Sequence, residues 1–479
     1  MTLTQQRATL ALDPDRLLPA DPATRDVARG LYESVASLPI LSPHGHVDPA
    51  LLLNDTPFGD PAELFIRYDH YVTRLMHAAG IDLERLGIPT RDGRAGAGIA
   101  QPRAVWRTFC ENWYLYAGTA SGYWLQHAFA TLFGIGEQPS AENAERLFES
   151  IQARLDTDAY RPRALFSQFG IEVLATTDDP LDDLRSHDAL AADPRFTGRV
   201  VPTFRPDAYI TPSAAGWADN VARLADWSGS SVGDYRGYIE ALAARRRYFV
   251  EHGAVSADHG VLQPLTLDLD EPAASALFDR ALRGVASADE QNAFAGHMLL
   301  EMARMSVDDG LVMTVHAGVV RNYSTQTFER FGPDTGHDIP TATHYVEPLR
   351  PLLEKYGNAR DFHLVLFSVD ETVYSREIAP LAGFYPSVYI GAPWWFLDAP
   401  DAVQRFRSSV TETAGFYRGS GFIDDTRAFL SIPARHDMAR RLDSAFLARL
   451  VREGRVDLAS AERIAIDLVD AIPRKAFKL

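Results

Sequence analysis

Two histidines one residue apart are the pair in this sequence best suited to chemistry. His44 and His46 follow the short apolar run "LPILSP". On an extended segment two side chains at this spacing point to the same face. Two neutral imidazoles on one face suit a divalent transition metal such as zinc. The spacing alone leaves open a second interpretation, a pair of hydrogen-bonded surface histidines in a polar loop.

Titratable residues also follow other apolar runs, in "TTDDP", "FRPD", "ADHG", "VHAG" and "DDTRAF". In a (β/α)₈ barrel the carboxyl ends of the strands line the active site. His316 ends one such run, and strand alternation requires one of Asp424 and Asp425 to point inward. An inward aspartate would complete a metal site and handle protons. A helix N-cap is the alternative role for such an aspartate.

Arg427 stands two residues after Asp425. An inward arginine beside a metal is unfavourable unless it binds an anion, so its position indicates a carboxylate or phosphate substrate. A salt bridge to Asp424 or Asp178 is the structural alternative.

The elements that must position these residues are eight short apolar runs rich in β-forming residues. We predict strands at 38–42, 171–177, 199–205, 253–259, 311–316, 362–368, 388–391 and 422–426. We predict intervening helices at 271–282, 287–305, 343–356, 401–417 and 435–453, with Ser287 and Glu290 at capping-box spacing. This count is that of an α/β fold of the TIM-barrel type, (β/α)₈, although a doubly wound sheet could also use eight strands.

The gap between the first two runs is too long for one crossover and is aromatic and helix-like. We therefore interpret residues 50–168 as a helical insertion within a single barrel spanning 1–479, with Ser140 as an N-cap. Its segment "YDHYVTR" holds His70 and Tyr71, which as helix neighbours should not face the same core, so one is expected over the barrel mouth. An ordinary amphipathic helix is the alternative.

Composition limits the class of protein. The net charge of −17 argues against nucleic acid or an anionic membrane as the main partner. The one cysteine, Cys110, cannot form an internal disulfide, and the N-terminus lacks a signal-peptide pattern. No run is long and apolar enough to span a membrane. These features predict a cytoplasmic protein that does not bind membranes.

The motifs taken in order resemble a known family. The order is "HGH", "DHYVTR", "TTDDP", "RPD", "ADHG", "HAGVVRN", "WWF" and "DDTRAFLSIPARHD". It is similar to that of the uronate isomerase (glucuronate isomerase) family, a branch of the amidohydrolase superfamily, from about Leu17 to the C-terminus. The resemblance implies a (β/α)₈ barrel with a helical insertion, one divalent metal (usually zinc), and isomerisation of D-glucuronate to D-fructuronate and D-galacturonate to D-tagaturonate. The expected partner is a small hexuronate, and self-association into a homo-oligomer is left open.

The resemblance also implies roles for individual residues. His44, His46 and Asp425 would hold the metal, while Tyr71, Asp425, His316 and Arg427 would be catalytic. The remaining substrate contacts would be His70, Arg205, Asp258, His259, Arg321, Trp394 and Trp395. After the sixth strand the family pattern "NPRDNE" is replaced by "SVDETVYSRE", so an arginine expected there is displaced, with Arg376 as a candidate replacement. That strand ends in Phe367 and Ser368 rather than histidine, which favours one metal over two.

Aldose–ketose exchange moves a proton from C2 to C1 through an enediol, so it needs a base and an electrophile at the carbonyl. Tyr71 and a hydroxide on the metal are both candidates for the C2 base. Tyr71 qualifies only if a cation such as His70 or Arg427 lowers its pKa. Two other functions stay open at this point, a metal-dependent lactone or ester hydrolase of the same superfamily and a sugar-acid-binding protein with a decayed site.

Overall fold

Parallel strands form the centre of the protein. The computed structural model describes residue 10 and residues 12–92, 101–228 and 233–479. The strands of the two parallel sheets are β1 (Ile40–Ser42), β2 (Ile171–Ala175), β3 (Arg199–Val201), β4 (Thr203–Phe204), β5 (Ser256–Val261), β6 (Val312–Ala317), β9 (Leu364–Ser368) and β10 (Val388–Ile390). They are hydrogen-bonded in the orders β1-β2-β3 and β4-β5-β6-β9-β10, and every pair is parallel. Pro202, which has no amide hydrogen to donate, separates β3 from β4 within one predicted strand.

The predicted eighth strand at 422–426 is wrong as a regular strand. Its residues have no strand assignment, and Gly421 and Asp425 have positive φ angles of 74° and 41°, which a β-ladder does not tolerate. The segment nevertheless closes the barrel. Its Thr426 carbonyl accepts the His46 amide, and the Ser420 amide just before it donates to Ile390 at the end of β10. The eight barrel positions are therefore seven strands, one of them interrupted, and one irregular segment.

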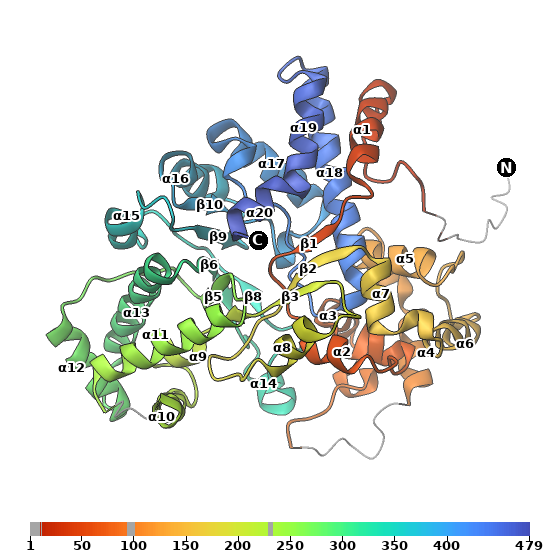
Figure 1. Ribbon diagram of the computed structural model, residues 1–479. Coiled ribbons are helices and arrows are strands. Elements are labelled where there is room, and N and C mark those ends of the chain that lie inside the picture. The colour runs from red at the N-terminus through yellow and green to blue at the C-terminus, as the bar shows by residue number, and fades with distance from the viewer. Residues whose placement is uncertain (1–9, 11, 93–100, 229–232) are drawn as a thin grey trace, which may run out of the picture.

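Helices surround this barrel (Figure 1). The longer ones are α8 (Arg185–Ala192), α10 (Trp217–Ser228), α11 (Tyr235–Glu251), α12 (Glu271–Leu282), α13 (Ala288–Asp309), α17 (Pro400–Ala414) and α18 (Ile432–Arg452). The shorter ones are α9 (Asp207–Ile210), α15 (Arg350–Tyr356) and α16 (Ala379–Phe384), with single turns at Tyr374–Ile378, Trp395–Leu397, Phe416–Arg418 and Phe429–Ser431. The prediction for α12 is confirmed, and so is the capping box between Ser287 and Glu290 at the start of α13.

Four helix predictions need correction at their ends. The helix predicted at 287–305 continues to Asp309, before Gly310 with φ 84°. The predicted helix at 343–356 is helical only from Arg350, because the amides of Tyr345 and Val346 donate to the carboxylate of Glu377 instead of continuing a helix. The helix predicted to end at 417 ends at Ala414, before Gly415 with φ 71°. The helix predicted from 435 already begins at Ile432, next to a proline in its first turn.

The described residues between α2 (Pro49–Asn54) and β2 contain only helical elements. These are Glu63–Arg67, α3 (His70–Ala78), Leu83–Leu86, α4 (Pro102–Glu111), Trp113–Tyr116, α5 (Ala120–Thr131), α6 (Ala144–Leu155), Asp158–Tyr160 and α7 (Pro162–Gln168). They share an aromatic core that includes Trp106, Phe109 and Phe129. The N-cap position of α6 is Asn143 rather than Ser140, whose amide instead donates a hydrogen bond to the Asn143 side-chain oxygen.

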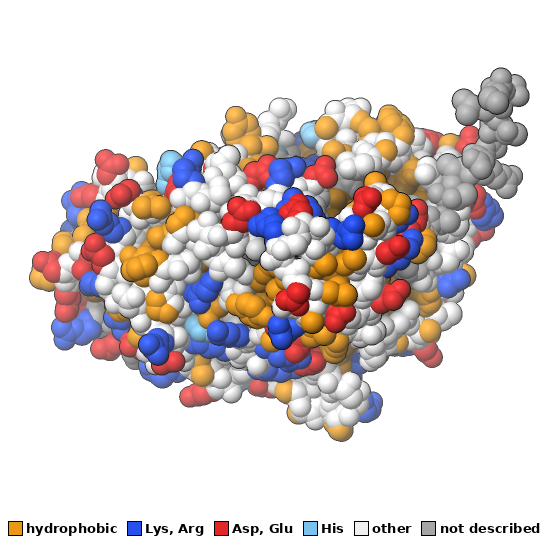
Figure 2. Space-filling view, turned by 90° about the horizontal axis from the view of Figure 1, so that it is seen from above, with side chains coloured by type: hydrophobic (Ala, Val, Ile, Leu, Met, Phe, Trp, Pro, Cys, Tyr) orange, Lys and Arg blue, Asp and Glu red, His pale blue; other side chains and the backbone are white. Residues whose placement is uncertain are grey.

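Two further segments complete the molecule. The N-terminal helix α1 (Pro22–Val35) packs with α18 and α19 (Leu458–Val469), followed by α20 (Ala471–Phe477). After β6 the chain forms the short antiparallel pair β7 (Val319–Val320) and β8 (Ile339–Pro340) with α14 (Thr325–Phe331) between them; we call residues 319–340 the strap. No helix in the described part of the chain is long and apolar enough to cross a membrane. Figure 2 shows acidic and basic side chains interspersed over the face that it displays.

Candidate metal centre and active-site cavity

His44, His46 and Asp425 converge at the carboxyl end of the barrel. The two histidines follow β1, and Asp425 lies in the irregular closing segment. Asp425 Oδ1 is 3.3 Å from His44 Nε2 and 2.9 Å from His46 Nε2. This oxygen makes no well-formed hydrogen bond with a described residue, although it is buried. The positive φ of Asp425 turns its carboxylate toward the histidines while Asp424 points to α18, where it contacts His436 Nε2 at 3.1 Å.

This arrangement fits a metal ion. Zinc bonds to histidine nitrogen and carboxylate oxygen are about 2.0–2.2 Å long, which separates neighbouring ligand atoms by slightly more than about 3 Å. The three ligand atoms of His44, His46 and Asp425 all lie within 4.8 Å of one another. A buried acceptor oxygen without a hydrogen bond is costly, and a coordinated cation satisfies it. The two nitrogens and one oxygen suit a first-row divalent metal and leave a position open for substrate.

A second cluster lies beside the first and contains Asp258 and His316. His316 Nδ1 is 2.6 Å from Asp258 Oδ1, and the Thr314 hydroxyl donates to the same oxygen at 2.6 Å. Arg205 Nη1 lies 3.2 Å from Asp258 Oδ2. Burial alone would raise the pKa of Asp258, but the charges of His316 and Arg205 hold it well below its usual range. His316 also stacks on His44, with ring centroids 4.6 Å apart.

His44, Asp258 and His316 form a second set with metal-ligand spacing. Arg205 places a fixed positive charge on the carboxylate of that set, which disfavours a second cation there. Asp258 is fully buried and does not line the cavity described next. His259 is also fully buried; it alternates to the other face of β5, and its Nδ1 contacts the Thr314 carbonyl at 3.0 Å.

A cavity of about 360 Å³ opens above the metal ligands. Most of the residues predicted as site residues line it: His46, His70, Tyr71, Arg205, Arg321, Trp394, Trp395, Asp425 and Arg427. Sequence reasoning missed others, among them Asp69, Asn322, Pro333, Asp334, Asp338 and Thr426. Four of these belong to the strap. The available signal was the polar stretch "GPDTGHD", which follows "HAGVVRN" within one βα connection.

His70 and Tyr71 both line the cavity. They occupy the first turn of α3, where Asp69 caps the helix by accepting the Tyr71 amide at 2.9 Å. Their rings are 4.7 Å apart, and His70 also packs on Trp395. Burial lowers the pKa of His70 to about 4, so its imidazole is neutral near pH 7.

Tyr71 is buried beside a different cation from those that the sequence suggested. The guanidinium of Arg435 lies 5.2 Å from the Tyr71 ring centroid and 3.5 Å from that of Trp124. Burial raises the pKa of Tyr71, and Arg435 only partly opposes this effect. Tyr71 is therefore a neutral phenol that can donate a hydrogen bond.

The three arginines in the cavity differ in how firmly they are held. Arg205 contacts both Asp258 and Asp207, at 3.2 and 3.0 Å. Arg321 contacts Asp338 at 3.1 Å and lies over Trp395. Arg427 has the longest contact, 3.4 Å to Asp334, and its side chain is about as exposed as that of Arg321, 43% against 45%. Arg427 is thus the least firmly held of the three cations.

Several predicted partners are replaced. Arg427 pairs with Asp334, and neither Asp424 nor Asp178 is its salt-bridge partner. Arg376 is bonded to Glu377 and does not line the cavity, so it does not replace the displaced arginine. Trp394 packs edge-on against His316, and Trp395, with φ 53°, packs against Arg321. The two tryptophans therefore form a wall of the cavity as well as part of the packing.

A (β/α)₈ barrel with two histidines after its first strand and an aspartate at its eighth position defines a class, the metal-dependent barrel enzymes. Comparisons with known proteins identify the family. The family model for glucuronate isomerase matches residues 22–473. The uronate isomerases of Corynebacterium efficiens and Cutibacterium acnes are 51% and 50% identical, each over 98% of this chain and 99% of the relative.

Solved structures agree with the sequence comparisons. The crystal structure of glucuronate isomerase from Caulobacter crescentus superposes with a TM-score of 0.95 at 46% identity, covering 98% of this chain and 97% of that one. Uronate isomerase from Thermotoga maritima gives a TM-score of 0.90 at 28% identity, covering 98% and 99%. The chain belongs to the glucuronate isomerase family, and the predicted barrel fold is confirmed.

Proposed function

We propose that this protein isomerises D-glucuronate to D-fructuronate and D-galacturonate to D-tagaturonate, with one bound Zn²⁺. The observation that carries the proposal is one cavity that joins a His-His-Asp ligand set to three arginines. The ligand set suits a metal that binds the carbonyl end of an open-chain sugar. The arginines suit the carboxylate at its other end. Family membership favours this reaction over the hydrolytic and binding-only alternatives.

Zinc bound to His44, His46 and Asp425 would supply a Lewis acid that stabilises the enediolate oxygens. The protein's own residues do the positioning. Arg427 has the longest ionic contact of the three arginines and would bind the substrate carboxylate. Arg321 and Arg205, each held by aspartates, would border the sugar. Holding the substrate in a reactive orientation lowers the free-energy barrier of the reaction.

Protons would be handled by Asp425 and Tyr71. Asp425 Oδ1 lies at the cavity floor without a well-formed hydrogen bond, so it can accept a proton from a substrate hydroxyl. Tyr71 is disfavoured as a phenolate base because burial raises its pKa. As a neutral phenol it would instead donate a hydrogen bond to the substrate oxygen on which charge develops. His316 does not line the cavity; it is held through Nδ1 by Asp258 and packs on His44, so its role would be to position that metal ligand.

Incubation with each hexuronate in D₂O, followed by proton NMR, tests the reaction. We expect the aldose signals to give way to those of the ketose, with deuterium at C1 on one face only and no uptake of water. Deuterium on both faces would contradict a positioned enediol mechanism. Absence of ketose from zinc-loaded protein would contradict the proposed function itself.

We also propose the cytoplasm as the compartment, supported by the single, buried, free Cys110. Cell fractionation with an antibody checks this. Size-exclusion chromatography with light scattering determines whether the chain associates into a homo-oligomer.

A further inference from the structure

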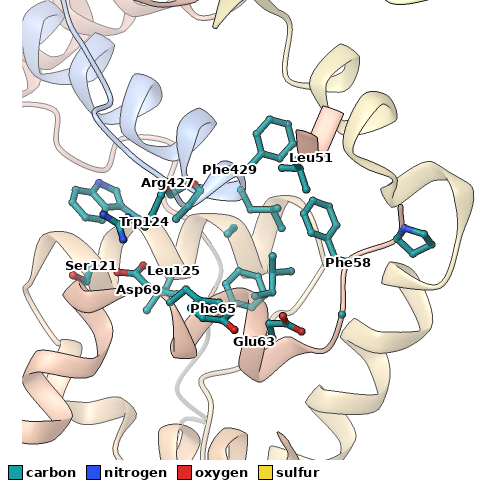
Figure 3. A pocket seen from close by; sticks show the side chains of 18 of the residues that line it. Leu51, Phe58, Glu63, Phe65, Asp69, Ser121, Trp124, Leu125, Arg427 and Phe429 are labelled. Carbon is teal, nitrogen blue, oxygen red and sulfur yellow. Dashed lines mark hydrogen bonds between the residues drawn. The ribbon is translucent and has the colours of Figure 1, made fainter. Parts of the chain in front are cut away.

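A second, mostly apolar cavity adjoins the active-site cavity. Its volume is about 330 Å³, and we call it the apolar chamber. Its main walls are Leu51, Phe58, Phe65, Trp124, Leu125 and Phe429 (Figure 3). Leu51 comes from α2, Phe58 from the loop after it, and Phe65, Trp124 and Leu125 from helical elements before β2. The two cavities share the lining residues Tyr68, Asp69, Arg427 and Ala428, so the apolar chamber directly adjoins the active-site cavity.

One end of the apolar chamber carries hydrogen-bond donors. In the view of Figure 3, Trp124, Ser121 and Arg427 lie toward one end, and Leu51 and Phe58 lie toward the other. Trp124 is 4% exposed, and its indole Nε1 has no hydrogen-bond partner among the described residues. Arg435 covers the face of this indole, which leaves the N–H group as its free polar feature. Because Nε1 has almost no accessible surface, Arg427 is the donor at this end that a ligand can reach.

Two carboxylates, those of Asp69 and Glu63, also border the apolar chamber. Asp69 is engaged as the N-cap of α3, through the Tyr71 amide. Burial raises the pKa of Asp69, and Arg435 opposes this effect. Glu63 lies away from Trp124 in Figure 3. The donor end is therefore better matched to an acidic group than to an ammonium group.

We propose that the apolar chamber binds an aryl monocarboxylate, with its carboxylate at Arg427 and its ring between Phe58, Phe65 and Phe429. An apolar cavity of about 150 Å³ accommodates benzene, so this volume holds one ring and a short chain. Aromatic walls favour offset or edge contacts with such a ring. Because Arg427 lines both cavities, the ligand competes with the hexuronate. That competition rests on the proposed function, whereas the binding itself does not.

A pair of carboxylic acids, one with and one without a phenyl ring, tests whether the apolar chamber contributes to binding. We expect 3-phenylpropionate to bind zinc-loaded full-length protein at least tenfold more tightly than propionate, by isothermal titration calorimetry. We expect the same ratio of inhibition constants against hexuronate turnover, with competitive kinetics. Equal affinity of the two acids would overturn the proposal. If the hexuronates are not turned over, the calorimetric arm still decides whether the site exists, so the two failures are distinguishable.

A variant at the far end of the chamber locates the ring. Phe58 is half-buried and stacks on Phe429 with centroids 6.5 Å apart. Phe58→Ala should reduce the tenfold advantage of 3-phenylpropionate to less than threefold and leave the affinity for propionate unchanged. Phe196→Ala is the matched control, because Phe196 is an equally half-buried phenylalanine that packs on Phe166 and lines neither cavity. An advantage that survives Phe58→Ala, or is lost equally in Phe196→Ala, would overturn the assignment of the ring to the chamber.

Discussion

Two carboxylate–histidine clusters stand side by side at the carboxyl edge of the barrel. At the junction of β1 with the closing segment, Asp425 Oδ1 faces two imidazoles without a well-formed hydrogen bond. Beneath the cavity, Asp258 Oδ1 accepts from Thr314 and contacts His316, while its other oxygen faces Arg205. The same residue types thus form a site that can accept a cation in one place. In the other, neighbouring residues already engage the carboxylate. The difference depends on what else reaches the carboxylate.

Asp425→Asn should have the largest effect on this comparison. The amide removes the anionic ligand and the proton acceptor together, so hexuronate turnover should fall by about 10²–10⁴-fold. Zinc content, measured by mass spectrometry of purified protein, should fall as well. Asp424→Asn is the control, since Asp424 contacts His436 rather than the ligand set. Full zinc content in Asp425→Asn would remove Asp425 from the metal centre.

Asp258→Asn should give a smaller loss with the metal retained. Outer partners of this kind orient the groups that act, and their loss typically costs about 10–100-fold in activity. We expect this loss in kcat, with little change in KM, because Asp258 does not line the cavity. A purely structural role would instead lower the melting temperature and leave the kcat of the folded fraction normal.

Arg427→Lys tests whether Arg427 binds the substrate carboxylate or only forms a structural salt bridge to the strap. Lysine keeps the charge but loses the forked geometry, and one charge-assisted hydrogen bond is worth roughly 1.5–3 kcal/mol. The value of kcat/KM should fall by about one to two orders of magnitude, with zinc content unchanged. Arg330→Lys is a control in the strap, since Arg330 pairs with Glu84 and does not line the cavity. Equal effects of the two substitutions would place Arg427 among structural salt bridges.

Asp178 is a third carboxylate at the end of a strand, and its hydrogen bonds come from neutral donors. Its substitution should have the smallest effect of those considered. It accepts the Thr176 hydroxyl and the Thr203 amide, and burial raises its pKa to about 7. The folded state then binds its proton more tightly than the unfolded state, so its contribution to stability is present at low pH and is lost as pH rises from about 4 to 7. Asp178→Asn does not titrate. Its melting temperature relative to the unaltered protein should therefore be higher at pH 8 than at pH 5, by about 1–4 °C.

A constant difference in melting temperature between pH 5 and pH 8 would contradict the raised pKa of Asp178. Asp193→Asn is a suitable contrast. The hydrogen bonds of Asp193 with Arg195 and Arg163 lower its pKa, so its contribution to stability is lost only in acid.

The sequence by itself determined the features that depend on near neighbours. A single spacing placed His44 and His46 on one face, and local capping rules located the start of α13 at Ser287. The apolar runs identified seven of the eight barrel positions as strands, because strands buried on both faces are continuously apolar. The ordered motifs were enough to indicate the family.

Only the tertiary structure decided features that depend on distant segments or on one backbone angle. Alternation could not choose between Asp424 and Asp425, because the choice is made by a left-handed residue that breaks the strand. The partner of Arg427 is Asp334, 93 residues away in sequence, supplied by a strap that no periodicity places over the barrel mouth. The apolar chamber forms where α2 and the helices before β2 meet Phe429, which follows the closing segment. Sequence patterns record what each segment buries, whereas the groups that face one another across a cavity are fixed only when the chain closes the barrel.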